Sequence, residues 1–256
     1  MIRRTITCHS KRENRFFSFD RVSSFYSKDS SRILATLRYD VSSLLVLPTS
    51  ELLCGLGDGN IYVLNSTTGV TIRVILAQDN IIWSLVLLST GELASSSDQT
   101  VIKIWNVSSG QLVRNLEGHR DTVFKLAVLP SGQLASASWD YTVRIWNTDT
   151  GRSVKKLVGH TYWVTALAVL QNGTLASGSY DGTIRVWDVV SGKTLQVLVW
   201  IKGPYEGSNT LQMLSNGNLA SGYINGTILT WDLETGQVVY IVYKSCVSHY
   251  DLTNYC

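Results

Sequence analysis

The stretch Leu134–Trp146, LASASWDYTVRIW, has two further copies in the chain and decides the fold. It aligns without a gap on Leu93–Trp105, LASSSDQTVIKIW, and on Leu175–Trp187, LASGSYDGTIRVW. Trp231 ends a similar segment, so that these four tryptophans are 41, 41 and 44 residues apart. A unit repeated at such a period cannot bury its apolar face alone, and it must stack on copies of itself.

Within each repeat, short runs of β-branched and aliphatic residues alternate with turn residues. Turn pairs such as Asp181-Gly182 and Asn216-Gly217 contain residues that tolerate positive φ, so they fix the register of the strands on either side. The sequence therefore predicts an all-β chain without helices. In the third repeat the four predicted strands are Val123–Leu129, Gln133–Ala137, Thr142–Trp146 and Val154–Val158.

Four-stranded antiparallel sheets repeated at this interval are typical of the blades of a β-propeller. Gly118-His119 and Gly159-His160 stand 27 residues ahead of Trp146 and Trp187 when counted from each histidine, and Trp187-Asp188 and Trp231-Asp232 complete a Trp-Asp dipeptide. With these residues the chain resembles the WD-repeat β-propeller family over residues 41–236. The resemblance implies a propeller of four-stranded antiparallel blades.

Five repeats are clear, and the termini supply material for more. We expect a divergent segment at 1–31, a propeller at 32–243 and a tail at 244–256. A degenerate sixth blade built from both termini is the most economical arrangement, with Phe16–Asp20 as a worn third strand. A five-bladed ring, or an open ring related to a larger propeller, remains open.

Two segments compete for one strand position at the ring closure. In the resembled family, an N-terminal strand often closes the ring as the outer strand of the last repeat, and Arg32–Leu37 fits that role. Gln237–Tyr243 follows Trp231 and fits the same position.

The resemblance also implies a buried hydrogen-bond network of His, Ser, Asp and Trp inside a blade. A Ser, a His and an Asp can also form the catalytic set of a hydrolase. A set that recurs twice at a fixed offset, each time with an indole donor, instead favours buried polar groups that satisfy one another. We therefore expect no catalytic residues and no enzyme activity. The network residues are His119, Ser136, Asp140 and Trp146 in the third repeat, and His160, Ser177, Asp181 and Trp187 in the fourth.

Three repeats depart from this pattern, and we expect their blades to open more easily than the other two. The departures are Gln78 and Gln99 in the second repeat, Pro204 and Asn225 in the fifth, and Cys54, Asp58 and Leu64 in the first.

Partners of the resembled family commonly dock on the face near the channel mouth, and aromatic side chains gather at the matching positions here. Trp and Tyr are favoured contact residues because they bury a large area with few rotatable bonds. The predicted partner-binding residues are Trp83, Asp98, Phe124, Trp139, Trp163 and Tyr180, and the other positions of this register in the same repeats are Ile81, Thr122 and Thr165.

These residues predict a non-catalytic protein–protein interaction scaffold or adaptor that binds proteins or peptides. Such a scaffold can be part of a multi-protein complex. As an alternative, Trp83 and Phe124 partly pack the channel wall. A second alternative is a reader of a methylated side chain, held by cation–π attraction with Asp98 as the counter-charge.

Composition supports a globular chain without an obvious ligand. The 256 residues are 45% hydrophobic and 16% charged, and the net charge of +3 comes from scattered basic residues, so neither a nucleic-acid surface nor a membrane segment is predicted. Cys8, Cys54, Cys246 and Cys256 have no metal-ligand spacing. We expect no metal, no cofactor, and a cytoplasmic or nuclear location.

Overall fold

The structure is a computed structural model that describes residues 23–26, 33–37, 39–78, 80–200 and 207–242. These residues form the strands β1 to β22. The described part of the chain contains no helix, and so none that is long and apolar enough to cross a membrane.

Twenty of the described strands form five four-stranded antiparallel blades, each in simple up-and-down order. The first blade contains β3 (Val41–Val46), β4 (Glu51–Leu56), β5 (Asn60–Asn65) and β6 (Thr71–Leu76). The second contains β7 (Ile82–Leu87), β8 (Leu93–Ser97), β9 (Ile102–Trp105) and β10 (Leu112–Leu116). The third contains β11 (Val123–Val128), β12 (Leu134–Ser138), β13 (Thr142–Asn147) and β14 (Arg152–Val158). The fourth contains β15 (Val164–Val169), β16 (Leu175–Ser179), β17 (Thr183–Trp187) and β18 (Thr194–Val199). The fifth contains β19 (Ser208–Met213), β20 (Leu219–Tyr223), β21 (Ile228–Trp231) and β22 (Val238–Val242).

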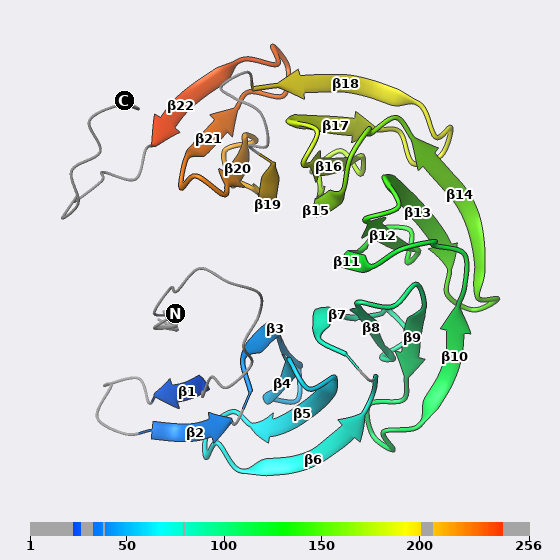
Figure 1. The fold of residues 1–256 in the computed structure, drawn as a ribbon, viewed down its shortest axis with the longest axis vertical. Coiled ribbons are helices and arrows are strands. Elements are labelled where there is room, and N and C mark those ends of the chain that lie inside the picture. The colour runs from blue at the N-terminus through cyan, green and yellow to red at the C-terminus, as the bar shows by residue number, and fades with distance from the viewer. Residues whose placement is uncertain (1–22, 27–32, 38, 79, 201–206, 243–256) are drawn as a thin grey trace.

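The blades follow one another around an arc, with the first strand of each near the centre and the fourth at the circumference (Figure 1). The predicted all-β propeller fold is thereby confirmed. The strands of the third repeat match their predicted ranges to within one residue, apart from β14, which begins two residues early. The fifth blade and the β1–β2 sheet stand at the two ends of the arc (Figure 1).

The competition for the outer strand of the fifth blade is resolved in favour of the C-terminal segment. β22 pairs with β21, whereas β2 (Ile33–Leu37) pairs with β1 (Ser23–Tyr26) in a separate two-stranded sheet. Within the predicted segment Arg32–Leu37, Ile33–Leu37 thus forms a strand, but at the other end of the arc. The remaining parts of the predicted sixth blade, Phe16–Asp20 among them, lie outside the described residues.

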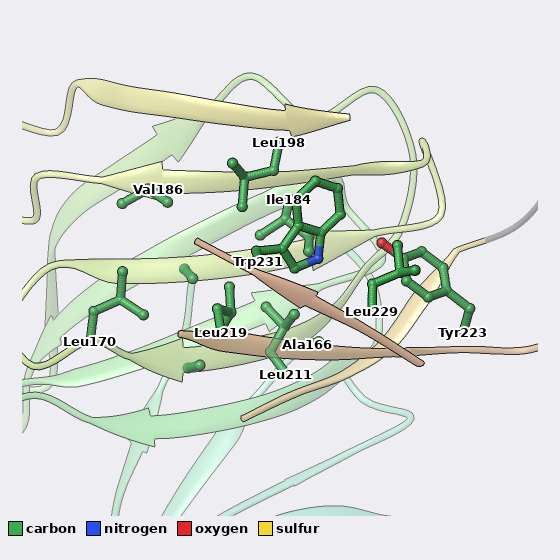
Figure 2. Close-up of a cluster of buried hydrophobic side chains, with 12 residues drawn as sticks. Ala166, Leu170, Ile184, Val186, Leu198, Leu211, Leu219, Tyr223, Leu229 and Trp231 are labelled. Atoms are coloured by element: carbon green, nitrogen blue, oxygen red, sulfur yellow. The ribbon is translucent and has the colours of Figure 1, made fainter. Parts of the chain in front are cut away.

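The cores of the molecule lie between consecutive blades. Figure 2 shows one of them, in which Trp231 and Leu219 of the fifth blade face Ile184 of the fourth. Similar clusters join the first blade to the second, the second to the third and the third to the fourth. Burying one large aliphatic side chain contributes about 1.5–3 kcal/mol, so each interface contributes more than any single hairpin turn.

Outer strands reach across these interfaces with long polar side chains. The Arg73 guanidinium donates to the backbone carbonyl oxygen of Val107 at 2.7 Å, and that of Arg114 donates to the carbonyl oxygen of Asp149 at 2.6 Å. Both acceptors belong to the turn between the third and fourth strands of the next blade. The two arginines occupy equivalent positions in their repeats, so the same contact joins successive pairs of blades. We call it an arginine tie, and the repeat position of the arginine a tie position.

The face of the fifth blade that points away from the fourth is left open by the described residues. Thr210 and Gln212 are exposed there, at the positions where the fourth blade buries Ala166 and Ala168. Ile228 on the same face is 47% exposed. This face is therefore more polar than the interblade faces, and it resembles the polar outer face of a terminal repeat.

The hairpin turns give a test of how tightly neighbouring blades constrain each other. Gly59 and Gly182 occupy equivalent turns with φ of 82° and 80°. A Cβ at Gly182 would meet no atom within 4 Å, whereas one at Gly59 would lie 2.1 Å from the carbonyl oxygen of Gln78. Only the turn that contains Gly59 therefore packs tightly against the next blade.

We predict that Gly182→Ala lowers the free energy of unfolding by about 1–2 kcal/mol, from the left-handed backbone alone. Gly59→Ala should lower it by roughly 1–3 kcal/mol more, because backbone must also move. Chemical denaturation of the two variants measures the difference. Equal losses would contradict the inferred contact.

Candidate functional site

The third blade contains a continuous chain of buried hydrogen bonds. The Trp146 indole N–H donates to the Ser136 hydroxyl at 2.8 Å, and Ser136 lies 2.6 Å from His119 Nε2. His119 Nδ1 lies 2.8 Å from Asp140 Oδ2. A carboxylate can only accept, so Nδ1 carries the proton, Nε2 accepts from the serine, and the serine oxygen accepts from the indole.

The fourth blade repeats this chain with nearly the same distances. The indole N–H of Trp187 donates to Ser177 at 2.7 Å, and Ser177 and Asp181 lie 2.8 Å from the two ring nitrogens of His160. The structure thus brings together both predicted sets of four residues. Each set joins the second strand, the third strand and the segment before the first strand of one blade.

Each Asp also organises the turn that it begins. Asp140 accepts from the backbone N–H of Arg120 at 3.1 Å and from the Thr142 hydroxyl at 2.6 Å. Burial by itself would raise the pKa of Asp140, but its hydrogen bonds outweigh this effect and hold that pKa well below its usual range. The pKa of Asp181 is lowered by the same set of contacts, from His160, Thr183 and the backbone of Thr161.

The order of atoms in this chain is that of a serine hydrolase, but its serine is inaccessible. Ser136 is fully buried and His119 is 5% exposed, so a substrate cannot reach the Ser136 hydroxyl without opening the blade. Burial also lowers the pKa of His119, although its hydrogen bond to Asp140 acts in the opposite direction. A neutral imidazole that bridges two fixed groups fits a structural network.

The second blade keeps part of the network with a different residue. Gln78 takes the place of the histidine: its amide Nε2 lies 3.4 Å from the Ser95 hydroxyl, and its Oε1 accepts from Ser97. Trp105 still donates to Ser95 at 2.9 Å. The fifth blade keeps the Trp231-to-Ser221 bond at 2.8 Å, while Pro204 lies outside the described residues.

The predicted partner-binding aromatics form one connected row across blades two to four, on the edge where first strands begin and second strands end. Near-parallel rings lie next to each other along it: the centroids of Phe124 and Trp139 are 6.2 Å apart, and those of Trp139 and Trp163 are 4.4 Å apart. Trp83 continues the row at 4.7 Å from Phe124, and Tyr180 continues it at 5.8 Å from Trp163. We call this row, together with the neighbouring tyrosines Tyr141 and Tyr162, the aromatic surface.

The polar groups of this surface have unequal environments. Asp98 is exposed and accepts a hydrogen bond from the Trp83 indole N–H. The Trp139 indole nitrogen is buried without a hydrogen-bond acceptor, and the Trp139 ring is nearly parallel to the rings of Phe124 and Trp163. The row is therefore a packed assembly of half-buried rings and not a set of separately projecting side chains.

Three positions of the same register are internal. Ile81, Thr122 and Thr165 are buried, with 8%, 5% and 2% of their surface exposed. The Thr122 hydroxyl donates to the carbonyl oxygen of Asp98 at 3.2 Å, and that of Thr165 donates to the carbonyl oxygen of Ser208 at 2.7 Å. Both threonines join neighbouring blades and are not available to a partner.

Two tyrosines that sequence reasoning missed belong to the aromatic surface. Tyr162 lies 5.0 Å from Trp163, and Tyr141 stacks on Tyr162 at 5.7 Å with an interplanar angle of 17°. Tyr141 is 41% exposed and adopts φ of 68° in the turn where the fourth blade has Gly182. A bulky residue at a glycine position was the available signal, since such strain clusters at functional sites.

Comparison with known proteins identifies the repeats. The model of the WD domain, G-beta repeat, matches residues 110–147 and 151–188. A crystal structure of the WD40 beta propeller domain of Doa1 superimposes with a TM-score of 0.73 at 25% sequence identity, covering 83% of this chain and 72% of that chain. No curated protein matches the sequence. Because 1603 solved chains match, the fold by itself does not single out a function.

Removing the carboxylate of the third-blade network should destabilise the protein. We predict that Asp140→Ala lowers the free energy of unfolding by about 1–3 kcal/mol, because His119 and the backbone N–H of Arg120 lose their acceptor. Asp149→Ala in an exposed turn is the control and should change it by less than about 0.5 kcal/mol. Indistinguishable denaturation curves for the two variants would refute the structural role of the network.

The network should also make stability depend on pH in a defined direction. A histidine with a lowered pKa binds its proton more readily when unfolded, so stability falls as the pH drops below about 6.5. The aspartates have lowered pKa values, so their contribution is present above about pH 3.9 and is lost as the pH falls further. Melting temperatures between pH 8 and 3 should therefore decline in two stages.

His119→Gln provides the matched variant, since Gln78 shows that the position accepts glutamine. We expect its melting temperature to depend less on pH between about pH 6.5 and 5 than that of the parent, because the variant lacks the His119 imidazole. An identical slope in both proteins would show that His119 does not contribute.

Proposed function

The chain is a WD40-repeat β-propeller protein, and from this premise we propose that it is a non-catalytic scaffold that holds a partner peptide or protein across the aromatic surface. WD40 propeller domains generally mediate protein interactions and are generally non-catalytic. The observation that carries the proposal is Tyr141, an exposed tyrosine in a strained turn that stacks on Tyr162, which in turn lies against Trp163.

The strain at Tyr141 argues for a role at the surface. A non-glycine residue held in the left-handed region costs of order 1–3 kcal/mol, and the equivalent turns of other blades avoid this with glycine at positions 59 and 182. Stability alone therefore does not favour tyrosine there. A gain in contact area for a partner offsets the strain.

The charges around the surface indicate the chemistry of the partner. Asp98 and Asp121 are exposed near the row, with Arg120 also exposed beside Asp121. Indole faces attract cations, arginine guanidinium above all. We infer a partner segment that carries apolar or basic side chains. Stacked rings present faces and edges for such a segment to lie across.

The reader function for a methylated side chain is the second candidate, because aromatic rings and Asp98 lie together. A cage needs rings that surround a space, whereas the neighbouring rings here pack at 4.4–6.2 Å from Trp139. Asp98 is also engaged by Trp83. We therefore rank this function below the docking of an extended segment.

The test separates loss of binding from loss of stability. We predict that Tyr141→Gly weakens partner capture several-fold while the melting temperature stays the same or rises, since glycine relieves the strained backbone. Trp163→Ala should abolish capture but lower stability somewhat, because Trp139 loses its stacking partner. Affinity capture followed by mass spectrometry, with melting curves for each variant, measures both properties.

Leu195→Ala on the outer strand of the fourth blade serves as the exposed control and should capture the same partners as the parent. Undiminished capture by both Tyr141→Gly and Trp163→Ala would rule out the aromatic surface as the docking site. A modified-peptide array distinguishes the second candidate: binding that requires methylation would favour the reader function.

A further inference from the structure

The outer strand of the fifth blade exposes four consecutive apolar side chains. Val239, Tyr240, Ile241 and Val242 are 44%, 66%, 41% and 57% exposed. In the other outer strands of the described blades, at most two consecutive apolar residues are exposed to this degree. Large contiguous apolar exposure of this kind marks an interaction site or an aggregation hazard.

The position of β22 at the end of the arc explains why both of its faces are exposed. Tyr240 occupies the repeat position of Arg73 and Arg114, whose side chains tie one blade to the next. The described residues place no blade beyond the fifth (Figure 1). An aromatic residue that stands at a tie position without a neighbour to reach is available to another molecule.

β22 is also an edge strand without the usual protection. Every second residue of an edge strand directs its N–H and C=O groups outward, and proteins guard such edges with lysine, proline or other charged residues. β6, β10 and β14 each contain Arg or Lys. Val238–Val242 contains neither charge nor proline. β18 lacks charge as well, but the fifth blade covers one of its faces.

The strand is nearly palindromic, and this identifies its partner as a second copy. We propose that two copies of the chain pair through β22, antiparallel about a two-fold axis at Tyr240. Val238 then lies opposite Val242, Val239 lies opposite Ile241, and Tyr240 lies opposite itself. Pairs of β-branched and aromatic residues are the favoured cross-strand pairs of antiparallel sheets.

The charges that flank the strand are complementary in this arrangement. Glu234 is exposed shortly before β22, and the sequence has Lys244 two residues after it. Antiparallel pairing places the start of one strand beside the end of the other, so the acidic sequence before β22 is matched with the basic sequence after it. A parallel arrangement would place like charges together.

The pairing closes on itself and does not propagate. An isologous contact uses the same edge in both copies, so the two fifth blades join into one eight-stranded sheet that ends at β19 on each side. The interface is small, because five residues a side fall well below the roughly 20–30 of a standard interface. The register shift between Val238 and Tyr240 weakens it further. The dimer should therefore dissociate on dilution.

The first experiment measures self-association of the full chain by sedimentation velocity over a range of concentrations. The parent should shift from monomer toward dimer as its concentration rises. Tyr240→Lys should remain monomeric with an unchanged melting temperature, because it places two lysines against each other at an exposed position. Leu195→Lys, at an exposed site of β18, is the matched control and should dimerise like the parent.

The second experiment tests the register with cysteines, in a background where Cys8, Cys246 and Cys256 are serine and Cys54 remains buried. Directly opposed residues in antiparallel strands have Cα atoms about 4.5–5.5 Å apart, which suits a disulfide. Tyr240→Cys should crosslink to itself under oxidation. Val238→Cys alone should not, but a mixture of Val238→Cys and Val242→Cys should yield the mixed dimer.

Several outcomes would overturn the proposal. A parent protein that is monomeric at every concentration contradicts it, and so does a dimer that survives Tyr240→Lys. A chain that dimerises only after residues 1–22 are removed would show that its own N-terminal segment occupies β22. Crosslinking of Val238→Cys to itself would exclude the stated register. None of these results bears on the aromatic surface, which lies on blades two to four.

Discussion

The structure depends on apolar contact between one four-stranded sheet and the next. The faces that meet between blades are apolar, so an isolated blade would leave them in water, and it gains stability only by stacking on a neighbour. The clusters that join consecutive blades contain the largest fully buried side chains, including Trp146, Trp187 and Trp231. The apolar contact makes the stacking of blades favourable. The turns, arginine ties and buried hydrogen-bond networks then fix the register of the strands and the position of each blade against the next.

Much of the fold follows from the sequence because local and long-range signals agree. Glycine and asparagine turns fix the hairpins, and the repeated tryptophans fix how one hairpin follows another, so the strands of the third blade lie where the pattern indicates. The fate of Arg32–Leu37 does not follow in the same way. Two apolar segments fit one outer position equally well, and only the connection to β21 across a short turn favours β22.

The functional surface follows less completely. The repeat register brings Trp139 and Trp163 to one edge, but it does not show that their rings stack, nor that Thr122 and Thr165 turn inward to bind the backbone of neighbouring segments. Tyr141 was not among the predicted partner-binding residues, because a turn position predicts backbone conformation and not the contacts of its side chain. Contacts between blades depend on side-chain direction across a curved interface, and a linear pattern does not contain that information.

The aspartate that ends the buried chain of hydrogen bonds also begins the turn that carries Tyr141. A partner bound to Tyr141 would therefore contact a turn that is connected, through Asp140, His119 and Ser136, to the buried indole of Trp146 in the same blade. Partner binding at Tyr141 and the stability of the third blade are then thermodynamically linked. A partner that binds the ordered turn raises the free energy needed to open the blade. A change that makes the blade easier to open lowers the binding free energy of the partner by the same amount.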